Sequence, residues 1–296
     1  MLNDKLSLNA WLEQATAQGI PLSDFLAARS AEELDINVEA LLAQMQEMLV
    51  VMQASAEHGL SGVRSRSGLS GGSACHLREE QNAKGYKNLL GPVVNDAVAF
   101  ALAVSESNAA MGRIVAAPTA GAAGILPGVL LALKAHYALT EEQLAKALIV
   151  AGNIGLVIAN RASLSGAVGG CQAECGSAAA MAAGAAVDAL GGTPTQVGTA
   201  VAIVFKNMLG LVCDPVAGLV EVPCVKRNAG ATVQALLAAE LALAGISSFI
   251  PADEAIDAMK SVGDSMSCSL RETAGGGLAC TPTALAWAEK YFAQES

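Results

Sequence analysis

The sequence predicts an all-α fold, and three observations lead to this prediction. Of the 296 residues, 53% are hydrophobic and only 15% are charged, so the chain can bury a large core and is not a disordered protein. Most segments begin with a recognisable helix-start signal. Sustained alternation of apolar and polar residues, which indicates half-buried strands, does not occur. We expect a compact helical domain rich in alanine and glycine, with a short helical N-terminal layer.

The N-terminal layer is predicted from apolar spacing and capping signals. Four apolar residues recur at helical spacing near the start of the chain: Leu8, Trp11, Leu12 and Ala15. Ser30 and Glu33 have the spacing of a capping box. From Val38 an apolar stripe continues over four turns, and Gly59 is the expected C-cap.

Later helices also have clear start signals. Thr140 with Gln143, and Thr193 with Gln196, have the spacing of capping boxes. Prolines mark other starts, since proline suits the first turn of a helix. The expected helices cover residues 93–111, 140–159, 193–205 and 251–263, with a last one from 282 onward. We assign residues 1–60 to the N-terminal layer and residues 61–296 to the main domain, as one continuous globular unit.

Charge, hydropathy and cysteine content restrict the class of protein. Mean hydropathy is high at +0.46, yet the one long uncharged stretch, Ile114–Leu133, is interrupted by Pro118 and Pro127 and is not expected to span a membrane. The first 19 residues are too polar for a signal peptide. Seven cysteines, an odd number, fit a reducing cytoplasm better than a secreted disulfide framework. A pI near 4.8 argues against a nucleic-acid partner.

Residues 61–74, SGVRSRSGLSGGSA, interrupt the helical pattern. Their composition suits a flexible linker. It also suits a loop in which backbone N–H groups and Arg64 or Arg66 hold an anion, because glycine permits the conformations that turn successive amides inward. Both interpretations remain open at this point.

Four cysteines fall in segments expected to be loops: Cys171, Cys175, Cys213 and Cys224. Free cysteine is commonly a buried apolar residue. Three of these thiols, however, stand next to Gly-Gly, Asp-Pro or Pro, which place a side chain on a fixed turn, as metal ligands often are. No CxxC pair occurs and the three histidines are distant in sequence, so thiolate ligation of zinc or of an iron–sulfur cluster is expected. Three thiolates on a four-iron cluster would leave one iron open to act as a Lewis acid.

Four segments carry a resemblance to a known family: PTAGAAGILPG, SGAVGGCQAE, KNMLGLVCDPVAGLVEVPCVKRNA and LRETAGGGLACTPT. Together they resemble the alpha chain of the iron–sulfur-dependent L-serine dehydratases of the bacterial two-chain type. The likeness covers nearly the whole chain from about Leu41 onward.

The resemblance implies an all-helical catalytic domain that converts L-serine to pyruvate and ammonia without pyridoxal phosphate. It implies a [4Fe-4S] cluster held by Cys171, Cys213 and Cys224, with one iron that has no cysteine ligand. Single-chain members of the family carry a fused regulatory-type α/β domain and a terminal cysteine. Neither is visible here, so a separate beta chain is the expected partner. The other four cysteines are expected to be structural: Cys75, Cys175, Cys268 and Cys280.

β-Elimination from serine also needs donors for the substrate carboxylate and a base for the Cα proton. Candidate substrate-binding residues lie in the Ser-Gly loop (within residues 61–74), in the Pro-Thr-Ala-Gly loop (residues 118–121) and directly after Cys224. They are Ser67, Gly68, Ser70, Gly71, Gly72, Thr119, Gly121, Arg227 and Asn228. Lys226 and His76 are the candidate bases, and a base from the beta chain is equally open.

Three alternatives compete with this function. The same open iron could act on cysteine or threonine instead of serine. A pyridoxal-phosphate lyase would use a lysine as Schiff base, but those folds are α/β. A non-enzymatic helical module could use its cysteines to bind zinc or to sense oxidation.

Overall fold

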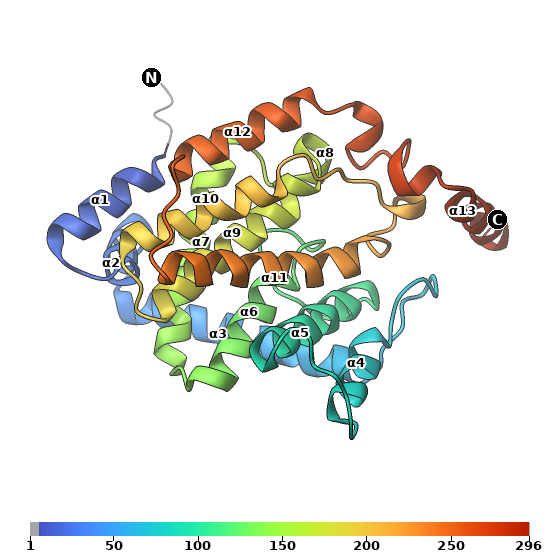
Figure 1. Cartoon of the computed structure of the whole chain (residues 1–296), viewed down its shortest axis with the longest axis horizontal. Coiled ribbons are helices and arrows are strands. Elements are labelled where there is room, and N and C mark those ends of the chain that lie inside the picture. The colour runs from blue at the N-terminus through green and yellow to red at the C-terminus, as the bar shows by residue number, and fades with distance from the viewer. Residues whose placement is uncertain (1–5, 296) are drawn as a thin grey trace.

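The computed structural model describes residues 6–295, in which helices are joined by loops (Figure 1). The all-α prediction is confirmed: within residues 6–295 no strand occurs, and only two isolated β-bridges are present. The α-helices are α1 Leu8–Gln18, α2 Leu22–Glu33, α3 Val38–Leu60, α4 Ser73–Asn82, α5 Pro92–Ala109, α6 Ile125–Tyr137, α7 Glu141–Arg161, α8 Gly166–Gly169, α9 Cys171–Ala189, α10 Pro194–Met208, α11 Cys224–Leu243, α12 Ala252–Ser265 and α13 Pro282–Glu295. Three short 3-10 helices join them: η1 Val216–Gly218, η2 Cys268–Leu270 and η3 Gly277–Cys280.

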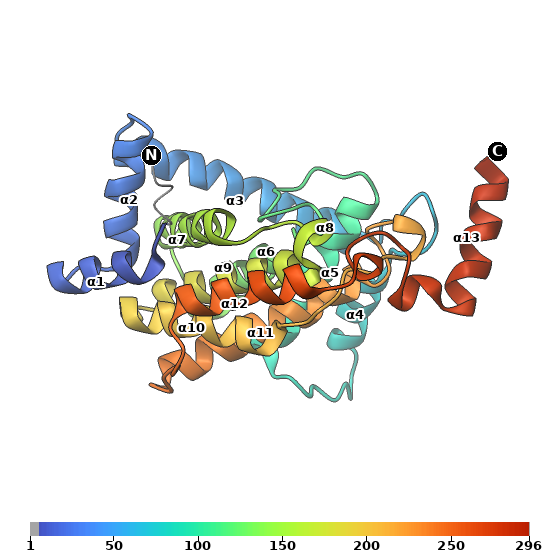
Figure 2. The ribbon, with the colours of Figure 1, turned by 90° about the horizontal axis from the view of Figure 1, so that it is seen from above.

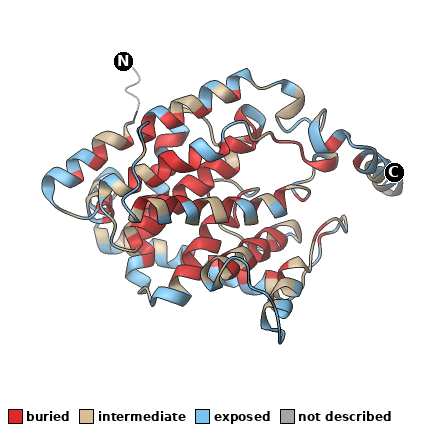
Figure 3. Ribbon diagram, in the orientation of Figure 1, coloured by how far each residue is buried: buried red, intermediate tan, exposed pale blue. Residues whose placement is uncertain are grey.

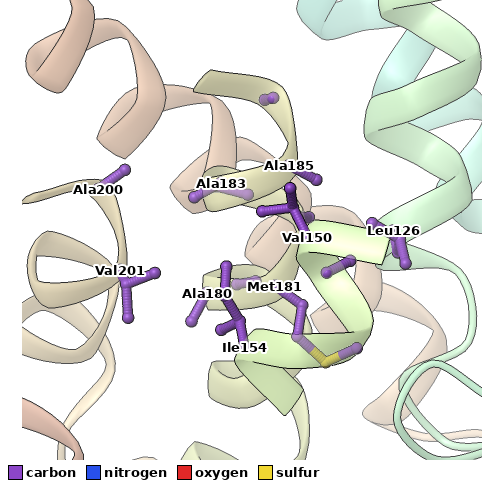
Figure 4. Close-up of a cluster of buried hydrophobic side chains, with 14 of the residues drawn as sticks. Leu126, Val150, Ile154, Ala180, Met181, Ala183, Ala185, Ala200 and Val201 are labelled. Carbon is purple, nitrogen blue, oxygen red and sulfur yellow. The ribbon is translucent and has the colours of Figure 1, made fainter. Parts of the chain in front are cut away.

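Helix α9 is the centre of the bundle. It packs against α6, α7, α10 and α11, and every residue in it is buried except Glu174 and Asp188. Its alanine and glycine residues let the neighbouring backbones come close. A Cβ on Gly184, for example, would lie only 2.3 Å from Ile154 Cδ1. Figure 4 shows the contact between α7, α9 and α10, with Ile154 and Val201 facing the small residues of α9. Figure 3 shows the buried residues concentrated in these central helices.

The N-terminal layer packs onto this bundle rather than standing apart (Figure 2). The predicted stripe of α1 is buried. Asp253 of α12 fixes the start of α1, because its carboxylate accepts hydrogen bonds from Ser7 Oγ at 2.6 Å and Leu8 N at 3.0 Å. Residues of α1, α2 and α3 belong to the same buried cluster as those of α6, α7 and α9 to α12. The division at residue 60 stays a prediction.

Two predicted helix boundaries were wrong. Ser30 does not begin a helix: it lies in the last turns of α2, which starts at Leu22 directly after Pro21, and its hydroxyl instead accepts a hydrogen bond from Asn153 Nδ2 at 3.0 Å. Gly59 is not a C-cap. It lies inside α3, where a Cβ would be 1.9 Å from the Ala103 carbonyl oxygen of α5, so its small size serves helix packing.

The other predicted starts agree with the structure. Both capping boxes are complete, at Thr140 for α7 and Thr193 for α10. Within the described residues, α7 alone is long and apolar enough to cross a membrane by length and composition, and 67% of that window is buried inside the protein. This burial is what a core helix requires. Helix α13 projects from the body in both views and packs mainly on η1 and η3 (Figures 1 and 2).

Candidate functional site

The three predicted ligand cysteines are buried at the ends of central elements. Cys171 is the first residue of α9, Cys224 is the first residue of α11, and Cys213 lies between α10 and η1. Their exposed fractions are 2%, 8% and 3%. The predicted loop position is therefore right for Cys213 only. Gly170 and Pro223 end the preceding loops, so the other two ligand candidates begin helices, and Cys175 lies one turn inside α9.

The pKa values of the buried thiols depend on one another. Burial, followed by the nearby Cys171 thiolate, raises the pKa of Cys213 far above its ordinary value and that of Cys224 to about 12. The pKa of Cys171 is lowered, first because the Cys175 thiol donates a hydrogen bond to it and also because Arg227 is close. The same hydrogen bond, together with burial, raises the pKa of Cys175. Three thiolates grouped here thus need positive charge beyond Arg227.

Three buried thiols are ligands of the type that zinc and iron–sulfur clusters take. Across residues 6–295, no three His, Cys, Asp or Glu side chains converge closely enough to hold one metal ion. In a four-iron cluster each cysteine binds a different iron, so the thiols stand further apart. Two of the three thiols begin helices, where the helix dipole favours a thiolate. The residues present therefore suit a cluster with three cysteine ligands.

The segment after α12 folds over Cys213. The Cys213 N–H donates to the Leu270 carbonyl at 2.9 Å, and the Glu272 N–H donates to the Cys213 carbonyl at 2.7 Å. The neighbouring Asp214, 2% exposed, accepts from the Leu278 N–H at 2.7 Å and pairs with Arg227 at 2.8 Å. Arg227, a predicted substrate ligand, is thus joined to Asp214, and its guanidinium also donates to the Val212 carbonyl at 2.8 Å.

Asn228 holds the Pro-Thr-Ala-Gly loop against α11. Its amide nitrogen donates to the Gly121 carbonyl at 2.7 Å and the Cys224 carbonyl at 2.9 Å, and its oxygen accepts from the Gly124 N–H at 3.0 Å. The side chain is 1% exposed. In this structure its hydrogen-bonding groups are engaged in positioning the loop beside Cys224.

Glu174 is the site residue that sequence reasoning missed. Thr119 of the Pro-Thr-Ala-Gly loop donates a hydrogen bond to its carboxylate, and Gly121 lies against the same group. A Cβ on Gly166 would be 2.9 Å from the Cys213 sulfur and 3.4 Å from Glu174 Oε2, so both approach one spot on α8. Burial raises the pKa of Glu174, and the hydrogen bond from Thr119 opposes this. A single acid in the first turn of an alanine-rich helix, three residues after Cys171, was the available signal.

The Ser-Gly segment is an ordered loop, so the linker interpretation is wrong. Ser65 and Ser70 are buried, and the Ser65 N–H donates to the Ser70 carbonyl at 3.0 Å. The loop does hold a carboxylate, that of Glu221, through the hydroxyls of Ser67 and Ser70.

Four glycines of this loop take positive φ: Gly62, Gly68, Gly71 and Gly72. Gly71 has no room for a side chain, because a Cβ would lie 2.3 Å from the Val63 carbonyl oxygen. Gly72 is the N-cap of α4, whose first two backbone N–H groups, of Ser73 and Ala74, donate to the fully buried carboxylate of Glu106 at 2.9 and 3.1 Å.

The two predicted bases lie on the surface near this loop. His76 is exposed on α4. Lys226 is exposed on α11, and its Nζ donates to Ser73 Oγ at 3.1 Å. Their role as bases stays a prediction. Glu174 is the titratable group that this structure brings beside the cysteines and the Pro-Thr-Ala-Gly loop.

Comparisons with known proteins identify the family. The family model described as "Serine dehydratase alpha chain" matches residues 13–279. A protein of Bacillus subtilis (strain 168), described as "Probable L-serine dehydratase, alpha chain", is 52% identical over 95% of this chain and 93% of that protein. The "L-serine dehydratase, alpha chain" of Peptoniphilus asaccharolyticus is 41% identical over 92% of this chain and 93% of that protein. "L-serine dehydratase 2" of Escherichia coli (strain K12) is 40% identical over 88% of this chain and 57% of its own length. The chain therefore belongs to the serine dehydratase alpha chain family.

Proposed function

We propose that this chain is the catalytic alpha chain of an iron–sulfur L-serine dehydratase, which eliminates water from L-serine to give pyruvate and ammonia. The observation that supports this most directly is the group of three buried thiols, Cys171, Cys213 and Cys224, at the starts of α9 and α11 and in the segment that η2 covers. Family membership supports the reaction, and the donor set supports the cofactor.

Cys171, Cys213 and Cys224 would hold a [4Fe-4S] cluster, which would supply one iron with an open position as Lewis acid for the substrate hydroxyl. The chain's own residues would orient the substrate and manage protons. Thr119 and Gly121 place the Pro-Thr-Ala-Gly loop beside Glu174. Glu174, whose pKa is raised by burial, is the candidate proton-transfer group beside this loop.

The overall reaction balances without an oxidant. A proton leaves Cα and hydroxide leaves Cβ, which gives the enamine 2-aminoacrylate and water. The enamine tautomerises to an imine, and water hydrolyses the imine to pyruvate and ammonia. The protein must therefore act only on the elimination, for which it needs a positioned base and a held carboxylate.

A separate beta chain is the proposed partner, in a cytoplasmic heterodimer. Two relatives that this chain covers almost completely are named alpha chains, and such a name implies another subunit. The Escherichia coli relative, which this chain matches over 57% of its length, has further sequence in the same polypeptide. A regulatory-type α/β domain is the expected content of the beta chain.

The decisive experiment is an anaerobic assay of iron, sulfide and turnover on the purified chain with its partner. We expect about four irons and four sulfides per chain. We also expect pyruvate from L-serine, at higher kcat/KM than the elimination products of threonine or cysteine. One zinc per chain and no turnover would contradict the proposal. A lysine imine trapped by borohydride would indicate pyridoxal phosphate instead. Loss of activity in air, restored by ferrous iron and thiol, is a further expected result.

A further inference from the structure

The Ser-Gly loop already binds one carboxylate in this structure. Ser67 Oγ donates to Glu221 Oε1 at 2.7 Å, and Ser70 Oγ donates to Glu221 Oε2 at 2.6 Å. Each carboxylate oxygen therefore has its own hydroxyl donor. Glu221 is 7% exposed, so the interaction is largely shielded from water.

The two hydroxyls are held in place by the loop itself. Ser67 Oγ accepts from the Leu69 N–H at 3.0 Å and lies 3.1 Å from Ser65 Oγ. Ser65 Oγ also accepts from the Ser70 N–H at 3.3 Å. The donors are thus prearranged for a planar, two-oxygen anion, which reduces the entropy cost of binding one.

The position of Glu221 connects this carboxylate to the rest of the site. It lies three residues before Cys224, and its backbone carbonyl accepts from the Val225 N–H at 3.0 Å in the first turn of α11. The preceding residue, Val220, lies against Gly121 of the Pro-Thr-Ala-Gly loop and is 37% exposed. The segment that carries Glu221 is a short turn, residues 220–223, directly before α11.

We infer that Ser67 and Ser70 form the carboxylate-binding pair for the amino-acid substrate, and that Glu221 occupies this pair until the substrate displaces it. The inference rests on the proposed function. An amino acid offers the same planar carboxylate as Glu221, and both cannot accept from the two hydroxyls at once. The internal carboxylate therefore weakens apparent substrate affinity, because only the fraction of protein with a free pair can bind.

The test is Glu221→Gln in the complete enzyme with its partner. The neutral amide accepts more weakly from the two hydroxyls than a carboxylate does, so KM for L-serine should fall about five-fold with kcat nearly unchanged. Ser67→Ala and Ser70→Ala should each raise KM about ten-fold in the Glu221→Gln background, and by less in the wild type, where each change also weakens the competing Glu221 carboxylate. L-Serinamide lacks the carboxylate, so its inhibition constant should be the same in the wild type and Glu221→Gln.

Glu57→Gln on the exposed face of α3 is the matched control and should leave KM unchanged. If Glu221→Gln folds poorly by circular dichroism, Glu221→Asp replaces it: the shorter acid reaches the hydroxyls less well and should also lower KM. A KM that stays the same or rises in the folded variants, while the wild type turns over L-serine, overturns this inference alone. Failure of the wild type both to turn over L-serine and to bind it by calorimetry overturns this inference and the proposed function together.

Discussion

At the residue scale, the proposed cofactor depends on three thiols in different surroundings. Cys171 has the neighbouring thiol of Cys175 as a hydrogen-bond donor, whereas Cys213 and Cys224 are buried with raised pKa values. A thiol must lose its proton to bind iron, so the cluster would have to stabilise all three thiolates. Removal of any one should weaken the other two sites as well.

We expect Cys213→Ser to lose most of its iron and to reduce turnover by more than about 100-fold, because a hydroxyl is a poor substitute for a thiolate ligand. Cys280→Ser is the matched control, since Cys280 is exposed in η3 and should be dispensable, as Cys75 and Cys268 should be. Iron content, the visible absorbance of the cluster and pyruvate formation are the measurements. Full iron content in Cys213→Ser would show that the ligand assignment is wrong.

The candidate residues show how much of the site could be predicted from the sequence. Composition and neighbouring glycine and proline drew attention to the cysteines, and the resemblance selected three of them. Asn228 was expected to bind substrate, but its amide holds the Gly121 and Cys224 carbonyls. Glu174 and Glu221 were missed because each gains its importance from partners far away in sequence. Apart from the position of Glu174 in the first turn after Cys171, such long-range contacts leave no local pattern in the sequence.

At the element scale, close helix packing depends on particular glycines. A Cβ on Gly59 would collide with the Ala103 backbone between α3 and α5, so Gly59→Ala should destabilise the protein by about 1–3 kcal/mol. Gly152, exposed on α7 with nothing within 4 Å, is the matched control. Gly152→Ala should stabilise by about 0.5–1 kcal/mol, because alanine loses less backbone entropy in a helix. Equal effects of the two changes in urea unfolding would contradict this account of packing.

Asp188 links two elements in a pH-dependent way. Near the C-terminal end of α9 its carboxylate accepts from the Ser23 N–H of α2 at 3.1 Å. Burial raises the pKa of Asp188, and the hydrogen bonds from Ser23 oppose this rise. The folded state therefore holds the proton more tightly than the unfolded state. The stability that this group contributes is complete below its ordinary pKa of 3.8 and is lost as pH rises through the higher folded value.

Asp188→Asn keeps an oxygen for the Ser23 N–H but does not ionise. The free energy of unfolding of this variant, relative to that of the wild type, should therefore increase as pH rises from about 4 to about 7. Urea unfolding at several pH values measures it. Asp264→Asn, an exposed position on α12, should show little such change. A difference between Asp188→Asn and the wild type that stays constant with pH would rule out the burial of an ionised Asp188.

Helix starts were predicted best, because capping is local. Thr140 and Thr193 bind backbone groups only three residues away, so their sequences were sufficient. Ser30 has the same spacing to Glu33, yet it lies within α2, since a helix begun at Leu22 continues through it. Gly59 was predicted to end a helix because the sequence could not show that it lies against Ala103 of α5.

At the scale of the whole molecule, helix-start signals and the lack of strand alternation were enough to predict the all-α class, but not the arrangement of the site. The site combines the Ser-Gly loop, the Pro-Thr-Ala-Gly loop, α8, α9, α11 and the segment after α12, which are spread over more than 200 residues of sequence. The family resemblance brought these segments together in advance except for the Ser-Gly loop, which was a candidate because the substrate carboxylate needs hydrogen-bond donors. The structure adds which backbone groups join them.

Exposed apolar side chains at the edge of the site indicate that this chain works with a partner. Val168 is 50% exposed and precedes Gly169 and Gly170, and Val220 is 37% exposed and precedes Glu221. Leu278 is 45% exposed and follows Gly277, which lies against Asp214. Exclusion of water from the proposed site would strengthen the electrostatic interactions within it. A partner subunit that buries these side chains would exclude water from the site and would also remove their apolar surface from solvent.

We therefore expect the isolated chain to be an incomplete enzyme. Co-expression with a beta chain from the same organism should raise kcat/KM for L-serine at least about ten-fold, because a covered site strengthens the electrostatic interactions within it. The complex should bury more than about 1,000 Å² and survive moderate salt during purification. Val220→Lys, which places a charge at the edge, should weaken association, whereas the matched change Val50→Lys on the exposed face of α3 should not. Full activity of the isolated chain, with no further gain from a beta chain, would show that this site needs no cover.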